Sequence, residues 1–428
     1  MSALLYVFRE YRGSYQRVGA LQPDGEAAVF SYAPEYLSDA TATSISVSLP
    51  LQSEAFDPKV TRSFFEGLLP EGELRRLLAD ALHITMDAYA ELLARLNNES
   101  IGALVFCTDE SGPDVTYGYE AFTSEDLRRF SQQPARIALD TTLTSRLSLA
   151  GAQTKIGLYH TGDDTLSGWF LPQGLAPSTH IVKASSETFP LQTINEEFCL
   201  LAAQYCGLNT ARSFLISVGE TPPLLAVERF DRIFPADPRV VDGLVAPQRL
   251  HQEDMCQAAG IPAFLKYEPT DGHYLSLVVR TLNRAAEHPL EDRLVFFEQV
   301  LFDYLIGNCD NHLKNYSLLW SEDWSLCRLA PLYDVTCTTR YSELAHEMGI
   351  ALCESRRIDD VTQTDIRHAA RSVGIVEEAG WQRYLDLCKR FPQALKSAES
   401  VLVEQGFAEA ADIGQFISKD SAPRCALG

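Results

Sequence analysis

One loop in the C-terminal part of the chain combines residue types that can carry out phosphoryl transfer. In IGNCDNHLKNYS, Asp310 precedes Asn315 by five positions, and Lys314 lies between them. Kinase catalytic loops use this spacing to place the base for the attacking hydroxyl and a carboxamide ligand for magnesium. Because an Asp and an Asn at this separation also occur in ordinary polar loops, the loop becomes a prediction only together with other elements.

Two more residues follow in the order that phosphoryl transfer requires. Asp334 ends the apolar run APLYD, where a kinase places its second metal ligand, although no Phe-Gly pair follows it. Lys183 in HIVKAS lies among β-branched residues, and a buried ammonium group needs an anionic partner. Phosphate groups can supply that charge, together with either Glu196 or Glu197 at the start of the next helix. The plainer alternatives are a strand-end turn for the Asp and a surface position for the Lys.

A fourth segment can approach phosphate groups through its backbone. LSLAGAQTK, residues 147–155, carries the small residues Ala150, Gly151 and Ala152. Small side chains let backbone N–H groups contact phosphate oxygens. The segment matches neither the glycine-rich loop of protein kinases nor the P-loop consensus, so its composition alone does not decide its role.

Taken in order along the chain, these segments resemble the HipA family of serine/threonine kinase toxins. The resembling motifs are SLAGAQTK (148–155), THIVK (179–183), AVERFDR (226–232), LHQEDMCQ (250–257), KYEPTDG (266–272), GNCDNHLKN (307–315) and LYDV (332–335). SVSLPLQ (46–52) and FFEGLLPEG (64–72) extend the resemblance over the N-terminal part. The resemblance implies an α+β protein with a two-lobed, protein-kinase-like fold and an N-terminal α+β module.

The resemblance also implies roles for individual residues. Asp310 is implied to be the base that deprotonates a target serine, and Asn315 and Asp334 are implied to hold Mg²⁺. Lys183 is implied to contact the α- and β-phosphates of ATP, and the hinge backbone is implied to meet the adenine. The implied ATP-binding residues are Ala150, Gly151, Ala152, Gln153, Thr154, Lys155, Lys183, Glu228, Arg229, Phe230, His312, Leu313, Lys314, Asn315, Tyr333 and Asp334. Asn311 departs from the family pattern, which usually has Gly there.

Ser148 matches the serine that members of the family autophosphorylate. A phosphate group there would add nearly two negative charges to a loop that is meant to bind phosphate. We therefore expect the modified loop to leave its site and the kinase to switch off.

The resemblance implies partners as well. The family phosphorylates aminoacyl-tRNA synthetases, most often the glutamyl enzyme, which inhibits translation and leads to growth arrest and persistence. A small helix-turn-helix antitoxin of the HipB type is implied to neutralise the kinase and to tether it to operator DNA. Two alternatives are a catalytically idle, nucleotide-binding co-repressor that acts through its antitoxin and a small-molecule kinase. The intact set of catalytic residues argues against the first, and the N-terminal and hinge motifs argue against the second.

Composition limits the location and the partners of the chain. It has 428 residues and a net charge of -22, and a chain this acidic binds DNA poorly unless a basic partner carries it. No apolar run is long enough to span a membrane, and the N-terminus lacks the pattern of a signal peptide. The ten cysteines form no Cys-x-x-Cys pair. These features predict a cytoplasmic protein with reduced thiols that contacts no membrane. The resemblance to the HipA family implies that its cofactors are ATP and Mg²⁺.

Patterning divides the chain into four parts. We expect an N-terminal module (1–108), a connecting segment (109–145), a β-rich nucleotide-binding lobe (146–250) and an α-rich catalytic lobe (251–428). The module is expected to hold strands at 4–9, 27–32 and 44–51, helices at 59–69, 74–84 and 88–96, a turn at Asn97-Asn98 and a strand at 102–106. The later parts are expected to hold a strand–loop–strand at 145–159, strands at 179–183 and 224–229, and helices at 195–207, 275–287 and 294–306. Residues 418–428 are expected to fray.

Overall fold

The computed structural model describes residues 4–11, 13–24, 27–96, 99–162 and 164–427. The chain forms two compact units, which are described separately here. The first comprises Met1–Ser186, Phe214–Ala263 and Leu319–Cys327, and the second comprises Glu187–Ser213, Phe264–Leu318 and Arg328–Gly428. The turn expected at Asn97-Asn98 lies outside the described residues, and the four-part division of the chain stays a prediction.

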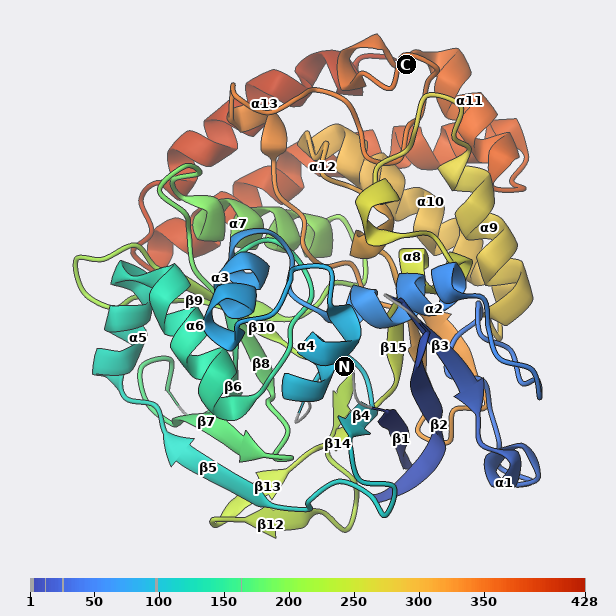
Figure 1. The fold of residues 1–428 in the computed structure, drawn as a ribbon. Coiled ribbons are helices and arrows are strands. Elements are labelled where there is room, and N and C mark those ends of the chain that lie inside the picture. Colours follow the sequence, from blue (N-terminus) through green and yellow to red (C-terminus); the bar gives the residue numbers. More distant parts are fainter. Residues whose placement is uncertain (1–3, 12, 25–26, 97–98, 163, 428) are drawn as a thin grey trace. The chain divides into compact units, whose positions relative to one another are not determined.

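The first unit begins with an antiparallel sheet of four strands in the order β3-β2-β1-β4. Its strands are β1 (Leu5–Tyr11), β2 (Ser14–Asp24), β3 (Ala27–Tyr32) and β4 (Leu104–Cys107). The short helices of this part are α1 (Pro34–Leu37), α2 (Pro58–Phe65), the 3-10 turn Glu66–Leu68, α3 (Gly72–Leu82) and α4 (Tyr89–Arg95). Phe30 on β3 packs against Phe65 on α2 with ring centroids 5.3 Å apart, so apolar residues of the helix cover this sheet (Figure 1).

A second sheet in the same unit has six strands in the order β5-β7-β6-β8-β10-β9. Its strands are β5 (Tyr117–Ala121), β6 (Lys155–His160), β7 (Trp169–Gly174), β8 (His180–Lys183), β9 (Ser213–Ile216) and β10 (Leu224–Glu228). Helices α5 (Ser124–Gln132) and α6 (Pro134–Ser145) share a buried apolar cluster with β6 and β8. The remaining short elements are β11 (Arg232–Ile233), β12 (Arg239–Val241), β13 (Leu244–Ala246), β14 (Gln248–Arg249), β15 (Gln252–Asp254), α8 (Met255–Ala259) and the 3-10 turn Ala263–Leu265.

The second unit is mainly helical (Figure 1). Its helices are α7 (Gln192–Tyr205), α9 (Tyr274–Ala285), α10 (Pro289–Ile306), α11 (Gln363–Ser372), α12 (Glu377–Glu404) and α13 (Ala410–Cys425). Its 3-10 turns are Leu313–Asn315, Thr338–Arg340 and Ile358–Asp360. Strands β16 (Ser317–Trp320) and β17 (Cys327–Leu329) each contain residues of both units. Phe302 on α10 meets Phe391 on α12 with ring centroids 5.9 Å apart, so α10 packs against the long helix through aromatic side chains. No helix among the described residues is both long and apolar enough to cross a membrane.

Three local expectations from the sequence are wrong. Residues 44–51 form bends rather than a strand, because the Ser46 hydroxyl bonds to Ser48 and Glu253 and draws the backbone out of a ladder. Residues 145–154 contain no strand, and the described strand there begins at Lys155. The C-terminal end does not fray, since α13 continues to Cys425 and the buried Arg424 donates to the carbonyl of Leu305.

Candidate active site

The expected catalytic loop begins at a helix end whose left-handed conformation favours glycine. Gly307 follows α10 in the left-handed conformation (φ +82°) and donates its N–H to the carbonyl of Asp303. A Cβ at this position would lie 2.4 Å from Oγ1 of Thr339. The helix therefore stops here, and the chain turns directly into the residues expected to carry the chemistry.

The buried carboxyl group of Asp303, which the sequence analysis did not single out, holds the loop in place through hydrogen bonds. Asp303 accepts hydrogen bonds from Asn308 Nδ2 (2.8 Å) and from the Tyr316 hydroxyl (2.6 Å). Asn308 Oδ1 in turn accepts the N–H of Asp310 at 3.0 Å. Burial raises the pKa of Asp303 to about 7, while its two hydrogen bonds lower that pKa. Asp303 thus fixes Asn308, and Asn308 fixes the backbone of the expected base.

The two ends of the Asp–Asn pair are joined through the backbone of the loop. The carbonyl of Asp310 accepts a hydrogen bond from Asn315 Nδ2 at 2.8 Å and another from the N–H of His312 at 2.8 Å. The side chain of Asp310 is 51% exposed, whereas that of His312 is 7% exposed. The loop therefore buries its frame and leaves the Asp310 carboxylate accessible, as a base for an incoming hydroxyl must be.

The contacts of the Asn311 side chain account for its departure from the glycine usual in the family. Its side chain is buried, and its Oδ1 accepts the N–H groups of Gly349 (2.8 Å) and Ile350 (3.3 Å). A Cβ on Gly349 would come within 2.8 Å of the His312 backbone. The Asn311 side chain thus links the loop to the closely packed segment that contains Gly349 and Ile350.

The segment around Asp334 is tied to the same loop. The Tyr333 hydroxyl donates to the carbonyl of Lys314 at 2.7 Å, and Thr338 Oγ1 accepts the N–H of Cys309 at 2.7 Å. Asp334 itself has φ +58°, a region that non-glycine residues rarely adopt. Residues held in this region cluster at functional sites, and here the conformation is maintained by bonds on both sides of Asp334.

Helix α7 is attached to that segment at its first turn. The Asn195 side chain donates to the carbonyl of Cys337 (3.0 Å) and accepts its N–H (3.1 Å). The next two residues are buried carboxyl groups, and burial raises the pKa of Glu197 to about 7 although a hydrogen bond from Ser213 lowers it. The choice between Glu196 and Glu197 as the charge partner of a lysine stays open.

In the first unit, two lysines form a cross-strand pair. Lys155 on β6 and Lys183 on β8 are direct partners in the antiparallel register, and both are buried. Directly opposed like charges repel one another. Lys155 Nζ donates to the carbonyl of Ala150 at 3.0 Å, and a Cβ on Gly151 would lie 2.8 Å from that same Nζ. The loop and its following strand thus surround an ammonium group closely, and the backbone conformation of Gly151 (φ +102°) favours glycine at this position.

The N-terminal part of the chain holds the expected phosphate loop in place. Ser148 is fully buried, its hydroxyl donates to the carbonyl of Leu68 at 2.7 Å, and its N–H donates to the carbonyl of Glu99 at 2.7 Å. Glu71 donates its N–H to the carbonyl of Gly151 at 3.1 Å. A modifying group can reach Ser148 only after these contacts open.

The expected hinge carries a buried charge cluster. Arg229 bonds to Asp231 (2.8 Å), and Arg232 bonds to Glu99 (2.7 Å), with Arg249 nearby. Burial alone would raise the pKa of Glu99, but the three guanidinium groups outweigh it and hold that pKa below its usual range. The N–H of Arg229 donates to the carbonyl of Thr179. Arg229 therefore anchors the expected hinge through its side chain and its backbone.

The expected residues separate cleanly between the two units. The first unit carries Ser148, Ala150, Gly151, Ala152, Gln153, Thr154, Lys155, Lys183, Glu228, Arg229 and Phe230. The second carries Asp310, His312, Leu313, Lys314, Asn315, Tyr333 and Asp334. The expected phosphate-loop, lysine and hinge residues thus belong to the first unit, and the expected base, metal ligands and remaining ATP-binding residues belong to the second.

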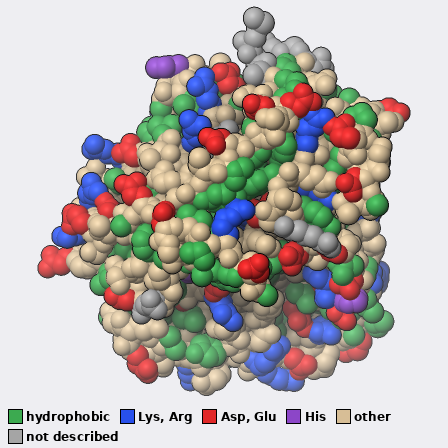
Figure 2. Space-filling model, turned by 90° about the horizontal axis from the view of Figure 1, so that it is seen from below, with side chains coloured by type: hydrophobic (Ala, Val, Ile, Leu, Met, Phe, Trp, Pro, Cys, Tyr) green, Lys and Arg blue, Asp and Glu red, His purple; other side chains and the backbone are tan. Residues whose placement is uncertain are grey.

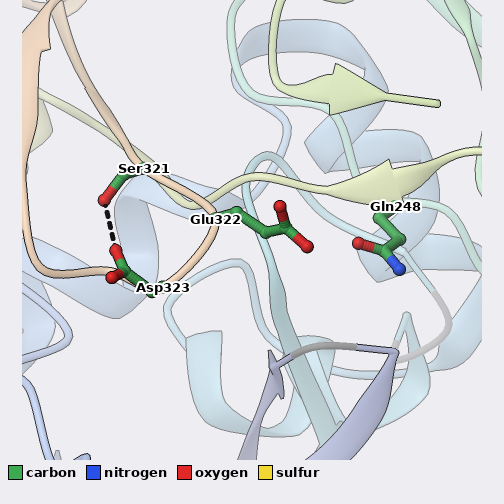
Figure 3. A pocket seen from close by; sticks show the side chains of 4 residues that line it. All are labelled: Gln248, Ser321, Glu322 and Asp323. Atoms are coloured by element: carbon green, nitrogen blue, oxygen red, sulfur yellow. Dashed lines mark hydrogen bonds between the residues drawn. The ribbon is translucent and has the colours of Figure 1, made fainter. Parts of the chain in front are cut away.

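None of these residues lines a pocket of about 510 Å³ in the first unit (Figure 3). Gln248, Ser321, Glu322 and Asp323 line it. Hydrogen bonds from Ser325 and Ser321 lower the pKa of Asp323 to about 2, so this carboxylate caps a turn. Within the described part of the chain, no group of three or more His, Cys, Asp and Glu residues is placed to hold a metal ion.

Comparison with known proteins decides the family. Residues 147–395 match the HipA-like C-terminal domain, and residues 13–107 match the HipA N-terminal domain. The chain belongs to the HipA family. The serine/threonine-protein kinase toxin HipA of Shewanella oneidensis is 26% identical over 406 residues, covering 90% of this chain and 87% of that one. Protein Y4mE of Sinorhizobium fredii is 32% identical over 357 residues, covering 81% and 80%.

The fold agrees with that assignment. The structure of Shewanella oneidensis HipA with HipB and operator DNA superposes with a TM-score of 0.79 at 21% identity, and the match covers 98% of this chain and 96% of that one. The α+β, protein-kinase-like fold expected from the motifs is therefore confirmed, as is membership of a kinase family. The roles of single site residues in this HipA-family chain stay predictions.

Proposed function

We propose that this chain is a serine/threonine protein kinase that transfers the γ-phosphate of ATP to a serine of an aminoacyl-tRNA synthetase in the cytoplasm. The observation that carries the proposal is the cross-strand pair of buried lysines, Lys155 and Lys183. Two ammonium groups that face the same side of a sheet attract a polyanion, and a nucleotide triphosphate provides one. Because the chain belongs to a family that includes protein kinases, we infer that this polyanion is ATP.

Asp310 acts as the base in this proposal. Its carboxylate is accessible while its backbone is fixed by Asn308, which suits a group that accepts the proton of a serine hydroxyl. Lys183 and the loop from Ala150 to Lys155 hold the triphosphate. Backbone groups of Glu228 and Phe230 meet the adenine, and Arg229 keeps the hinge in place through its charge cluster.

Asn315 and Asp334 are the residues that would hold Mg²⁺. The donor set fits, because carboxylate and carboxamide oxygens are the ligands that this ion prefers. Since the Asn315 nitrogen donates to the carbonyl of Asp310, its oxygen is left for a cation. The ion would neutralise charge on the phosphates. Tyr333, bonded to the Lys314 carbonyl, keeps the two ligand-bearing segments together.

Regulation by Ser148 is part of the proposal. In its buried position the hydroxyl bonds to Leu68, and a phosphate group would not fit between these backbone groups. Autophosphorylation therefore requires the loop to open and prevents it from returning, which switches the kinase off.

The proposed partners are a glutamyl-tRNA synthetase as substrate and a HipB-like helix-turn-helix antitoxin. A relative of this chain was solved with HipB and operator DNA. The face drawn in Figure 2 carries basic and acidic side chains interspersed, and the net charge is -22. This charge favours contact with DNA mainly through the antitoxin rather than through the kinase itself.

The test is transfer of labelled γ-phosphate from Mg²⁺-ATP to a panel of synthetases with their tRNAs, beside Asp310→Ala. We expect label on one synthetase and a loss of roughly two to four decades of rate in the variant. Normal turnover by Asp310→Ala would refute the assignment of the base. ATP binding without any transfer, in protein shown to be unphosphorylated at Ser148, would leave the co-repressor function in its place.

A further inference from the structure

A tyrosine from the KYEPTDG motif meets the expected base. The Tyr267 hydroxyl donates a hydrogen bond to Oδ1 of Asp310, although 43 residues separate the two in sequence. This oxygen also lies 3.9 Å from Nε2 of His312. The Tyr267 ring packs edge-on against the His312 ring, with centroids 5.0 Å apart and planes 81° apart. A phenolic hydroxyl thus occupies the position that a substrate hydroxyl would take at a general base.

The backbone that carries this tyrosine is fixed to the catalytic loop. The carbonyl of Lys266 accepts the N–H of Leu313 at 3.1 Å, and the N–H of Glu268 donates to the carbonyl of Gly349 at 2.8 Å. The Glu268 carboxylate accepts two further N–H groups, from Tyr274 and Ala351. The segment therefore cannot leave with its tyrosine, and only rotation of the Tyr267 side chain can clear Asp310.

The side chain has room for that rotation. Tyr267 is 46% exposed, and its neighbour Phe264 is 80% exposed. Exposed aromatic side chains change rotamer in nanoseconds or faster, so the change is fast compared with catalytic turnover.

We propose that Tyr267 is a gate for the acceptor: its hydroxyl competes with the substrate hydroxyl for Asp310 and rotates away when a protein acceptor binds. The gate rests on the proposed function of Asp310 as base. A small acceptor such as water must break the hydrogen bond between Tyr267 and Asp310 without forming other contacts that offset this free energy. A protein segment forms additional contacts around Tyr267 that offset it. Tyr267 is thus a positioning residue that favours protein acceptors over water.

The experiment compares Tyr267→Phe with wild type and with Tyr205→Phe, which alters an equally exposed tyrosine on α7 (Tyr205 is 47% exposed). Each protein is prepared with Ser148 unphosphorylated, and release of inorganic phosphate from Mg²⁺-ATP is measured with water as the acceptor. We expect Tyr267→Phe to hydrolyse ATP about tenfold faster or more, since one hydrogen bond to a charged group is removed. Tyr205→Phe is expected to match wild type.

Hydrolysis by Tyr267→Phe at or below the wild-type rate would overturn the gate. Asp310→Ala in the same assay separates the two proposals. If that variant loses hydrolysis and Tyr267→Phe is unchanged, the gate fails and the base stands. If Asp310→Ala hydrolyses ATP normally, the base itself is wrong. For a synthetase acceptor, the gate predicts a lower KM with unchanged kcat in Tyr267→Phe, a division that a purely structural role would not produce.

Discussion

Lys155 and Lys183 are direct cross-strand partners, and both lie below 10% exposure. A bound triphosphate would convert their repulsion into two charge-assisted contacts. We expect Lys183→Met to raise the Kd for Mg²⁺-ATP at least tenfold, or about 1.4 kcal/mol. Calorimetric titration measures this directly. Lys389→Met, which alters an exposed lysine on α12, is the control and should bind as wild type does.

The buried hydroxyl of Ser148 leads to a second prediction. Ser148→Asp places a carboxylate where a hydroxyl now bonds to the Leu68 carbonyl. Because an unpaired buried charge is costly, we expect the loop of residues 147–155 to open, with faster hydrogen exchange and weaker ATP binding. Ser148→Ala loses one hydrogen bond, or about 1 kcal/mol of stability, and should keep the loop closed. Equal exchange in the two variants would contradict this coupling.

Asn311 provides a test of the catalytic loop that leaves the proposed base intact. Asn311→Gly restores the residue usual in the family but removes the acceptor for the N–H groups of Gly349 and Ile350. We expect a loss of about 1–3 kcal/mol in the free energy of unfolding, because buried donors are left unpaired. Denaturant unfolding measures the loss, and an unchanged midpoint would show that water replaces the lost acceptor.

A pH-dependent contribution to stability comes from Glu253. Burial raises its pKa to about 8 in the folded chain, although Ser46 and Val47 donate hydrogen bonds that lower it. Between the unfolded pKa of about 4.3 and the folded value, the folded state keeps a proton that the unfolded state has lost. The free energy of unfolding therefore falls as pH rises through this window, by at most about 1.4 kcal/mol per unit.

Glu253→Gln removes that proton and keeps a group able to bond with Ser46 and Val47. We expect the variant to equal wild type near pH 5 and to exceed it in thermal stability near pH 8. Glu54→Gln, which alters an exposed carboxylate, is the control and should follow the wild-type pH profile. Parallel profiles for Glu253→Gln and wild type would show that Glu253 is ionised in the folded chain.

The sequence indicated that Asp310 and Asn315 share one short loop because the information for this loop is local, whereas the catalytic role of the loop stays a prediction. The spacing of Asp310 and Asn315 is set within a few residues, and the bond between them closes that same short loop. The strand expected at residues 44–51 was wrong because its alternating pattern also suits a bend whose serines bond to a distant carboxylate, Glu253. Local pattern cannot show which of these partners is present.

The relationships that depend on tertiary structure could not be predicted in the same way. The pairing of Lys155 with Lys183 follows from strand register, which the individual motifs do not contain. Tyr267 gave no signal beyond membership in a motif, since its contact with Asp310 spans 43 residues. Asp303 looked like one more polar residue on an amphipathic helix, and only its burial identifies it as the support of the loop.

The shared carboxylate of Glu99 has a consequence for how this protein can be divided. Glu99 precedes residues 147–395, which match the C-terminal family domain. Its carboxylate nevertheless forms ion pairs with Arg229 and Arg232, which lie within that range. A fragment starting at residue 147 would carry Arg229, Arg232 and Arg249 with their common counter-charge removed, at a cost of several kcal/mol. The two family domains can be told apart by sequence, yet the buried arginines of one depend on a carboxylate of the other for their charge balance.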